Sequence, residues 1–582
     1  MYVRTTQRRN SDGSVVRYVA LAAKQRVEGK SVAQVLVNLG REDELDRDGL
    51  ARLVASINRY LGVADAPAPE VTAMVGDELT VAGSRPMGSA YLLDGLWRAL
   101  GIDTALSRVL DARKFSTDVE RVLFALVANR AVDPLSKLAA AEWASEDVLI
   151  AGLAEMDDDQ AYRAMDLLAD DATAATVQGS VFFAVATLLN LEVDFLLFDT
   201  TSTYWECDTE DPDTSDVDSG EGTAGLRRYG HSKDHREDLP QIVIGLAVTK
   251  EGIPVRCWSW PGNTTDVTVL PQVKDDLAGW KLGRVITVVD RGFSSAANLS
   301  YLTRAGGQYI AGARMRDGNT LAQQALSRQG RYQDVRDNLR VKEVRLDDQP
   351  GVRWIICHNP EQAAKDKTDR DRHLDAVRAE LDRIAALRAK ATPASNTGKS
   401  KSKSKDPASE PAAHVKAECA LREHKALGRW VKQTPSGRLL LDTAKVAAEQ
   451  RLDGKYLLCT SDPTLPAGEV ALGYKNLLEA ERSFRDMKSV LALRPVYHRL
   501  QPRIRAHVLL CWLALLLVRV AERRTAMTWT TINRQLGRVH AVTLTGTAGT
   551  VVHTTPLTTA QASIVAACGL PQPPAVTALD PS

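Results

Sequence analysis

The sequence predicts an α/β protein whose central sheet combines antiparallel and parallel strands. Two short apolar runs, FLLF and VITVV, end in the aspartates Asp199 and Asp290. Runs of this kind, bounded by polar residues, are typical of buried strands. Between them, IVIGLAVTKEGIPVRCWSW predicts a β-hairpin with a tight turn, and PGNTTDVTVLPQVKDDL predicts a helix. The order is therefore three strands, a helix and a fourth strand.

Length and composition predict a cytoplasmic protein of several domains. A chain of 582 residues exceeds a single core, and this length predicts about three or four domains. The seven cysteines lie singly, without a CxxC pair, which argues against a zinc site or a disulfide framework and fits a reducing compartment. No apolar signal-peptide region is visible at the N-terminus. The apolar run Val508–Val518 is too short to span a membrane and predicts a buried helix.

Charge is distributed unevenly, although the net charge is only +1. Residues 151–220 carry seventeen acidic residues and one basic residue, whereas residues 481–540 carry twelve Lys and Arg against three acidic residues. An excess of Arg on a helical segment suits binding to a phosphate backbone. A solvated helix face would have the same composition, so the pattern by itself leaves both readings open.

The N-terminal third of the chain predicts three segments. Residues 1–65 predict a small β/α module, with short strands up to about residue 40 and a helix over roughly 46–62. This module could contact DNA or serve only as a structural cap. Residues 66–87, rich in Pro, Ala and Gly, predict a linker. Over 88–190, apolar residues recur at helical spacing and predict an all-α domain that could also bind DNA.

The rest of the chain divides at the two aspartates and at a long low-complexity stretch. Residues 191–299 predict the first part of a catalytic core, with an acidic surface loop after the first strand. Residues 300–465 predict a β-rich insertion that contains a highly charged helix and a disordered stretch over 391–413, rich in Ser, Lys and Pro. Residues 466–538 return to helices, and 539–582 predict a weakly ordered tail.

Three antiparallel strands, a helix and a further strand are the order of a ribonuclease H-like, or retroviral integrase-like, core. In such a mixed sheet the first and fourth strands can lie side by side, which would bring Asp199 and Asp290 together. A third carboxylate, Glu481, lies far downstream in the helical pattern YKNLLEAERSFRDMK. Three carboxylates on rigid elements are typical of divalent-metal chemistry on phosphates. No motif for nucleotide hydrolysis or redox chemistry is present.

The segments FDTTS, VVDRG and YKNLLEAERSFRDMK resemble the three catalytic blocks of DDE transposases from bacterial insertion sequences. The resemblance covers about 190–525 and is strongest for the subgroup with a β-rich insertion between the second Asp and the Glu. That subgroup's helix signature is Tyr, Arg three positions on, Glu seven on and Lys fourteen on. Tyr474, Glu481 and Lys488 fit this spacing and would share one helix face, whereas Leu477 departs from it. Lys475 or Arg485 would then supply the missing phosphate contact.

The three carboxylates and the resemblance together imply a mechanism. Asp199, Asp290 and Glu481 would hold two Mg²⁺ or Mn²⁺ ions that clamp the scissile phosphate, with Asp199 bridging both ions. Water would attack first and free a 3′-OH, which would then attack the target strand. The resemblance implies binding of double-stranded DNA, both terminal inverted repeats and target, by a homodimer, and a hairpin intermediate on the excised end.

Further residues are candidates for contacts around this site. The predicted DNA contacts are Tyr474, Lys488, Arg485, Arg494, His498, His231 and Lys233. Asp238 is a candidate for supporting the metal ligands. Trp258, Trp260 and Trp354 could stack on a flipped base, but a Trp in a strand is more often part of the core.

Two other functions fit the same residues. One is a ribonuclease H-like nuclease that cuts structured DNA without joining it. The other is a DNA-binding protein from a decayed element, which would predict a lost carboxylate, whereas all three are present.

Overall fold

The computed structural model describes residues 2–9, 15–27, 30–41, 79–110, 119–191, 193–215, 222–280, 285–316, 319–391 and 413–581. Within these residues the protein is a mixed α/β structure. The chain divides into two compact units. One consists of Met1–Ala82, Leu544–Val551 and Leu579–Ser582, and the other of Gly83–Thr543 and Val552–Ala578.

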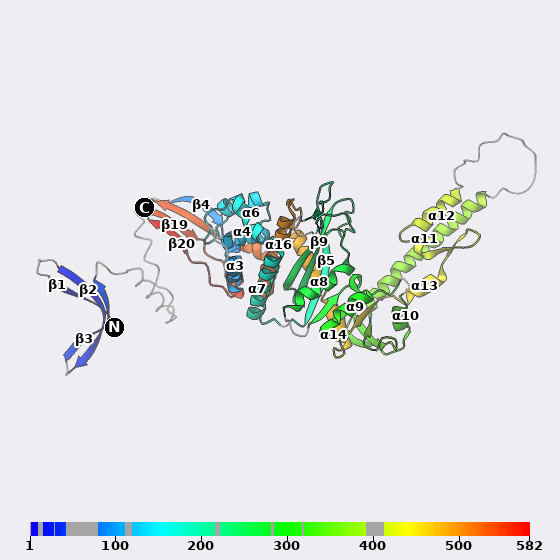
Figure 1. Ribbon diagram of the computed structural model, residues 1–582, viewed down its shortest axis with the longest axis horizontal. Helices are drawn as coiled ribbons and strands as arrows, with labels where there is room; N and C mark the ends of the chain where they lie inside the picture. The colour runs from blue at the N-terminus through cyan, green and yellow to red at the C-terminus, as the bar shows by residue number, and fades with distance from the viewer. Residues whose placement is uncertain are drawn as a thin grey trace, which may run out of the picture. The chain divides into compact units, whose positions relative to one another are not determined.

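The centre of the larger unit is a nine-stranded sheet in the order β12-β13-β14-β17-β11-β10-β5-β8-β9 (Figure 1). Strands β5, β8 and β9 are antiparallel neighbours, and β10 and β11 run parallel to β5. The first and fourth predicted strands therefore do lie side by side. The bounds of these five strands are Phe195–Tyr204 for β5, Gln241–Thr249 for β8, Pro254–Pro261 for β9, Ile286–Val289 for β10 and Gln308–Ala313 for β11.

The strands expected in a separate β-rich insertion instead continue the central sheet. Strand β17 pairs antiparallel with β11, and β14, β13 and β12 follow in turn. This pairing covers the backbone groups that β11 would otherwise expose as an edge strand. The bounds are Gln333–Arg336 for β12, Leu339–Arg345 for β13, Arg353–His358 for β14 and Lys455–Thr460 for β17.

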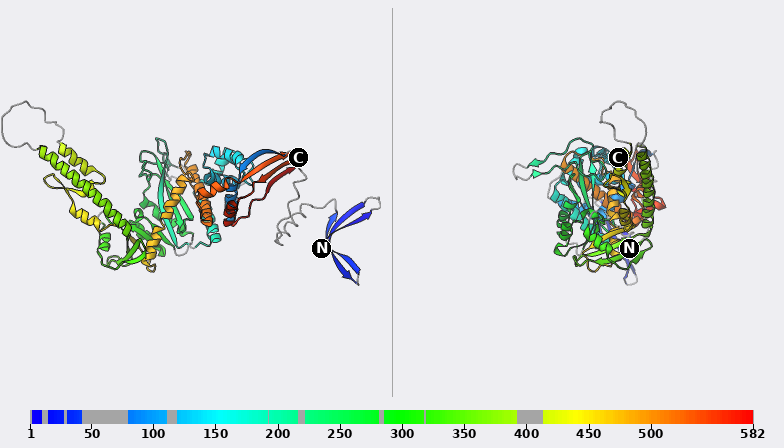
Figure 2. Two further views of the ribbon diagram at one scale, coloured as in Figure 1. Left: turned by 180° about the vertical axis from the view of Figure 1, so that it is seen from behind. Right: turned by 90° about the vertical axis from the view of Figure 1, so that its right-hand side faces the viewer.

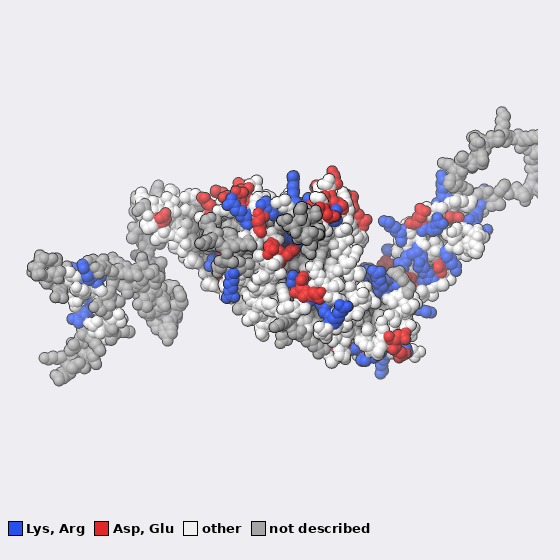
Figure 3. Space-filling view, in the orientation of Figure 1, with Lys and Arg blue, Asp and Glu red and all other residues white. Residues whose placement is uncertain are grey.

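Between β14 and β17 the chain makes a mainly helical excursion. Helices α11, Pro360–Ala391, and α12, Ala413–Glu423, pack side by side (Figures 1 and 2). Lys and Arg alternate with Asp and Glu over these helices, as Figure 3 shows, and many form ion pairs three residues apart, such as Arg383 with Glu380. Residues 443–450, within the segment expected to be β-rich, form helix α13. The low-complexity stretch 392–412 lies outside the described residues.

The remaining elements of the excursion form small structures of their own. They are η6 (Gly428–Trp430), β15 (Val431–Gln433), β16 (Leu439–Leu441) and α13 (Thr443–Gln450). The carboxylate of Asp442 accepts a hydrogen bond from the Lys445 backbone N–H at the start of α13. This capping contact ends the run of strand residues LLL and begins the helix.

Alternate residues of the central strands enter two different cores. On β5, Leu196 and Phe198 pack on one face, and Leu197 packs on the other. The Phe198 face is covered by helices from the segments after β9, β10 and β11. The Leu197 face is covered by helices that follow β17. The first set is α8 (Asp266–Ala278), α9 (Ala296–Leu302) and α10 (Thr320–Ser327); the second is α14 (Ala467–Lys475), α15 (Leu478–Ser489) and α16 (Gln501–Thr525).

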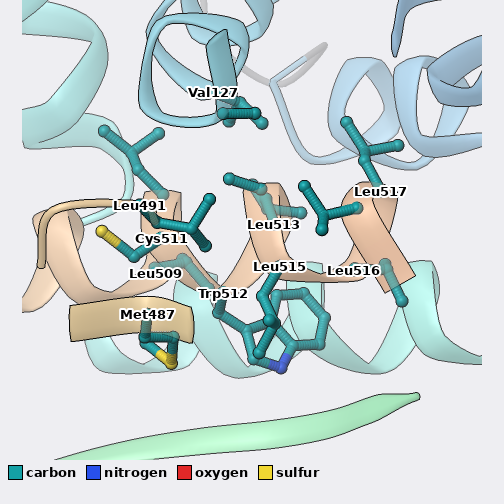
Figure 4. Packing of buried hydrophobic residues seen from close by; sticks show 14 of the residues in the cluster. Val127, Met487, Leu491, Leu509, Cys511, Trp512, Leu513, Leu515, Leu516 and Leu517 are labelled. Carbon is teal, nitrogen blue, oxygen red and sulfur yellow. The ribbon is translucent and has the colours of Figure 1, made fainter. Parts of the chain in front are cut away.

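Helix α16 joins the sheet to the N-terminal helices. It contacts β9 on one side and α4 and α6 on the other. In Figure 4, Leu513 points toward Val127 of α4, and Trp512 points to the opposite side. The helix is long and apolar enough to cross a membrane, but 94% of its most apolar window is buried inside the protein. The prediction of a buried helix over Val508–Val518 is therefore confirmed.

The helical pattern predicted over 88–190 corresponds to a series of short and medium helices. They are α2 (Gly88–Ala99), α3 (Ile102–Leu110), α4 (Val119–Val132), α5 (Lys137–Glu142), the π-helix η3 (Trp143–Asp147), α6 (Asp158–Leu167) and α7 (Asp171–Leu189). Most of their buried apolar side chains belong to the same hydrophobic core as α16, whereas Phe182 of α7 belongs to the core of the Phe198 face.

The C-terminal segment, expected to be a weakly ordered tail, contains regular structure. Its strands join β4, Thr80–Pro86, in a sheet of order β20-β19-β18-β4. Strand β4 lies in the segment expected to be a linker, so the pairing depends on a partner that is distant in sequence. The elements after α16 are α17 (Trp529–Leu536), β18 (His540–Gly546), β19 (Gly549–Thr554), α18 (Thr559–Ala567) and β20 (Val576–Pro581).

The N-terminal strands form a separate antiparallel sheet. Strands β1 (Tyr2–Arg9), β2 (Val15–Val27) and β3 (Lys30–Arg41) pair in sequence order. They correspond to the strands expected up to about residue 40. The helix predicted over 46–62 lies outside the described residues.

The close packing of β8 against the aromatic core generates a prediction. A Cβ at Gly245 would lie 2.5 Å from Cζ3 of Trp260 and 3.2 Å from Cε2 of Phe198. We expect Gly245→Ala to lower the free energy of unfolding by about 1–3 kcal/mol, because these buried rings have little room to move. Thermal denaturation measures the change. Gly279→Ala, at the end of α8 with no atom within 4 Å of the added Cβ, is the control and should be nearly neutral. Equal melting temperatures for the two variants would contradict the prediction.

Candidate active site

The pairing of β5 with β10 brings Asp199 and Asp290 to adjacent positions. The last residue pair of this parallel ladder is Phe198 with Val289, and each aspartate follows directly. Asp290 lies at the end of its strand, as predicted, and precedes the 3₁₀ turn Arg291–Phe293. Asp199 does not lie at a strand end, because β5 stays paired with β8 as far as Tyr204. Its carboxylate is therefore fixed by a strand that continues beyond it.

The surroundings of Asp199 disfavour its negative charge. The pKa of the Asp199 carboxyl is raised to about 6, mainly by burial and also by the negative charges of Asp266 and Asp290. The ammonium group of Lys233 and a hydrogen bond from the Thr200 backbone N–H act in the opposite direction. Crowded carboxylates of this kind are typical of sites that bind a cation.

Tyr474 supports the second aspartate. Its hydroxyl donates a hydrogen bond of 2.7 Å to Oδ1 of Asp290. Burial raises the pKa of Tyr474, and the charge of Asp290, this hydrogen bond and the charge of Glu481 raise it further. Tyr474 is therefore a neutral donor that holds the Asp290 carboxylate, and Glu481 lies near enough to act on it electrostatically.

The helix expected to carry Tyr474, Glu481 and Lys488 on one face is interrupted. Tyr474 belongs to α14, whereas Glu481 and Lys488 belong to α15. The break occurs at Leu477, whose side chain is buried in the core. The seven-residue spacing of Tyr474, Glu481 and Lys488 therefore does not follow the face of one continuous helix. Glu481 is exposed near the start of α15.

Asp266 is a fourth carboxylate at the site that the sequence reasoning missed. It is the first residue of α8, and its Oδ1 accepts a hydrogen bond of 2.5 Å from Oγ1 of Thr200. The only sequence signal was an aspartate at the start of a predicted helix, which is also the ordinary composition of a helix N-terminus.

Lys233, predicted as a DNA contact, lies among these carboxylates. Its Nζ is 3.4 Å from Oδ2 of Asp266 and 3.8 Å from Oδ1 of Asp199. It also donates hydrogen bonds of 2.8 Å to the backbone oxygen of Thr200 and 2.6 Å to its Oγ1. The ammonium group thus partly neutralises the site from within the chain.

The next residue along the chain holds two other predicted DNA contacts. The carboxylate of Asp234 lies 2.9 Å from Nζ of Lys488 and 2.7 Å from Nη1 of Arg494. The Arg494 guanidinium also lies over the ring of Tyr204, 5.5 Å from its centroid. The structure therefore brings Lys488 and Arg494 together beside the site.

The other predicted DNA contacts are dispersed. Arg485 is exposed on α15, and His231 is exposed and pairs with Glu237 at 3.1 Å. His498 instead faces Tyr162 and His507. Burial and the nearby charge of Lys137 lower the pKa of His498 to about 4, so it is neutral at ordinary pH.

The remaining candidates have structural partners. Asp238 pairs with Arg236 at 2.9 Å on the surface. Burial raises the pKa of the Cys357 thiol on β14, and the positive charge of Lys475 acts to lower it. The three tryptophans are buried in the core of the Phe198 face. The indole N–H groups of Trp258 and Trp260 donate to Asp276 and Gln272. Stacking of these rings on a flipped base would require the core to open.

Part of the Arg excess over 481–540 neutralises acidic residues of the same protein. Arg503 pairs with Asp166 at 2.9 Å, and Arg505 pairs with Asp171 at 3.3 Å, both within the acidic segment 151–220. The guanidinium of Arg519 is buried between Asp486 and Glu522. Part of the Arg excess therefore forms ion pairs within the protein. Neither interpretation of the sequence, DNA binding or a solvated helix face, had included this role.

The donor atoms at the site suit a hard divalent ion. Asp199, Asp290 and the neighbouring Asp266 offer only carboxylate oxygens, the ligands that Mg²⁺ and Mn²⁺ prefer. In the part of the chain that the structure describes, no three Asp, Glu, His or Cys side chains are already close enough to hold a metal ion. The chemistry of the donors thus fits a divalent metal ion.

Comparison with known proteins defines the class. A family model described as the transposase DDE domain matches residues 213–517, just over half of the chain. The chain therefore belongs to the DDE transposases, so the resemblance to this family is confirmed. A second model, the N-terminal domain of IS1634 family transposases, matches residues 3–68. This N-terminal segment is therefore similar to that domain of IS1634 family transposases. The DDE match includes Asp290 and Glu481 and begins after Asp199.

No match was found among curated proteins. Among solved structures, the chain is similar to the piggyBac transposase in its synaptic complex with hairpin DNA, with 8% sequence identity and a TM-score of 0.33. The similarity covers 77% of this chain and 79% of the piggyBac chain.

The raised pKa of Asp199 predicts a pH-dependent effect on stability. Between the ordinary value of 3.8 and about 6, the folded protein keeps a proton that the unfolded chain has released, so ionisation of Asp199 costs stability as the pH rises through this window. Without metal, Asp199→Asn should therefore stabilise the protein by about 2–3 kcal/mol above pH 6 and have no effect below pH 4. Thermal melts in EDTA at several pH values measure this.

The matched control is Asp194→Asn, which removes a carboxylate just before β5 that pairs with Lys250 on the surface. It should have little effect at any of these pH values. A loss of stability in Asp199→Asn at pH 7 would contradict the prediction.

Proposed function

We propose that this transposase carries out cut-and-paste transposition, cleaving DNA at the ends of its insertion sequence and transferring the freed strand into target DNA. The observation that carries the proposal is the adjacent placement of Asp199 and Asp290 beyond the paired ends of β5 and β10. Two carboxylates on neighbouring strands, with a third on a nearby helix, suit in-line phosphoryl transfer.

The order of the central strands supports a ribonuclease H-like core. Three antiparallel strands, β9-β8-β5, are followed in the sheet by β10 and β11, which run parallel to β5. Helix α8 connects β9 to β10, so the chain follows the strand, strand, strand, helix, strand order expected from the sequence.

Divalent-metal dependence is general in this family, and we propose that Asp199, Asp290 and Glu481 hold two Mg²⁺ or Mn²⁺ ions. Bound there, the ions would polarise the scissile phosphate and lower the pKa of the attacking water or hydroxyl. Glu481, exposed on α15, would complete the site by moving toward the two aspartates. Tyr474 would keep the Asp290 carboxylate oriented through its hydrogen bond.

DNA binding is supported by the position of the basic residues next to the carboxylates. Lys488 and Arg494 lie together beside the site and could each take a phosphate group, and Arg485 is exposed on the same helix as Lys488. We further propose that the partners are double-stranded terminal repeats and target DNA, bound in the cytoplasm by a homodimer that pairs the two ends. A nuclease that cuts without joining is the second candidate, and an assay for strand joining distinguishes the two.

The first test is DNA cleavage. Asp290→Asn should reduce Mg²⁺- or Mn²⁺-dependent nicking at the element's own end by more than about 100-fold, because a metal ligand is lost. Labelled duplexes carrying that end, resolved on denaturing gels, measure the rate. Asp347→Asn, which removes an exposed carboxylate paired with Arg328, should cut like the wild type. Equal cleavage by Asp290→Asn and wild type would overturn the assignment of the site.

The second test concerns the tyrosine. Tyr474→Phe removes the hydrogen bond to Asp290 and should lower the cleavage rate about 10–100-fold while leaving the fold intact. Tyr456→Phe, whose ring stacks on Tyr474 at 6.2 Å, is the matched control and should retain activity. The same loss in both variants would show that the effect does not come specifically from the hydrogen bond to Asp290.

A further inference from the structure

Two adjacent residues, Lys233 and Asp234, contact charge clusters of opposite sign. Lys233 approaches the carboxylates of Asp199 and Asp266, and Asp234 pairs with Lys488 and Arg494. Lys233 therefore lies where the proposed function expects a metal cation, and Asp234 lies where it expects a DNA phosphate. Each residue has the same sign of charge as the ligand expected there.

The turn that carries these residues is well defined. The backbone N–H of Lys233 donates to Oγ of Ser202 on β5, and the backbone N–H of Asp234 donates to Oγ of the buried Ser232. His235 has a φ of 57° and donates its N–H to the Ser232 backbone oxygen, which closes the turn. The two side chains are thus directed to their clusters by a tight turn anchored to the active-site strand.

The ammonium group of Lys233 occupies space that a cation would need. Its positive charge acts to lower the pKa of Asp199, and its Nζ lies 3.8 Å from Asp199 and 3.4 Å from Asp266. Two cations a few ångströms apart repel each other strongly in a partly buried site. A divalent ion that binds Asp199 would therefore displace Lys233.

The carboxylate of Asp234 occupies space that a phosphate would need. Both of its oxygens lie within 3.0 Å of Nζ of Lys488, and one also pairs with Arg494. The side chains of Asp234 and Lys488 are each only 13% exposed. A DNA phosphate can thus reach the Lys488 nitrogen only if Asp234 gives way.

We propose that Lys233 and Asp234 form an internal plug, which occupies the metal subsite with an ammonium and the DNA-phosphate subsite with a carboxylate until both ligands bind. This proposal rests on the proposed function. Because the two residues are adjacent, withdrawal of one pulls the other. Metal binding therefore frees Lys488 and Arg494 for DNA, and DNA binding frees Asp199 for metal. Such coupling is reciprocal, so each ligand strengthens the binding of the other by the same factor.

The experiment measures binding without cleavage. Isothermal titration with Mn²⁺ in the absence of DNA reports the metal subsite, and fluorescence anisotropy of a duplex carrying the element's end in EDTA reports the phosphate subsite. Lys233→Met should bind Mn²⁺ about 5–10-fold more tightly than the wild type, because the competing ammonium is gone. Asp234→Asn should bind DNA about 5–10-fold more tightly in EDTA, with a steeper salt dependence.

The coupling is measured with Ca²⁺ and the same duplex. Ca²⁺ should tighten DNA binding by the wild type and have a smaller effect on Asp234→Asn, whose phosphate subsite is already open. The controls are Lys250→Met, which removes an ammonium that pairs with Asp194, and Glu210→Gln, which removes a carboxylate that pairs with Arg228. Both should bind Mn²⁺ and DNA like the wild type.

Weaker or unchanged binding would overturn the plug, since it would show that Lys233 supports the metal ligands or that Asp234 positions Lys488 and Arg494. Melting temperatures establish that each variant is folded; if Lys233→Met unfolds, Asp234→Asn, which preserves the shape of the side chain, decides the question. A wild type that binds neither Mn²⁺ nor DNA would instead refute the proposed function. The two failures are therefore distinguishable.

Discussion

The parallel pairing of β5 with β10 is the constraint on which the rest of the site depends. It places Asp199 and Asp290 next to each other, although 91 residues of sequence separate them. Two carboxylates so placed repel each other, and burial makes the repulsion stronger. The protein tolerates this cost because the two strands are buried in the middle of a sheet that is covered on both faces.

Hydrogen bonds and ion pairs around the two aspartates partly offset this repulsion. Tyr474 donates a hydrogen bond to one aspartate, and Lys233 approaches the other. Beyond this layer, Asp234 holds the two cations that lie beside the site. Acidic and basic groups thus alternate around the site. Asp199, Asp290, Lys488 and Arg494 each contact a partner from the chain, whereas Glu481 is exposed.

The sequence was sufficient for the parts of this site that depend on local pattern. Apolar runs that end in an aspartate predicted β5, β10 and the position of Asp290, and the hairpin between them predicted the order of the sheet. The sequence could not show Asp266, because an aspartate at the start of a helix usually caps it. Nor could it show the break at Leu477, where the apolar pattern continues through two helices, or the pairing of Asp234 with Lys488, which are 254 residues apart.

The most direct measurement of the central claim replaces the metal with Fe²⁺ in the DNA-bound protein and adds ascorbate, so that radicals cut the polypeptide near the bound ion. The account predicts fragments that end close to Asp199, Asp290 and Glu481, and their suppression by excess Mg²⁺. Cuts that map elsewhere in the chain, or that persist in Mg²⁺, would contradict the claim that these three carboxylates hold the metal.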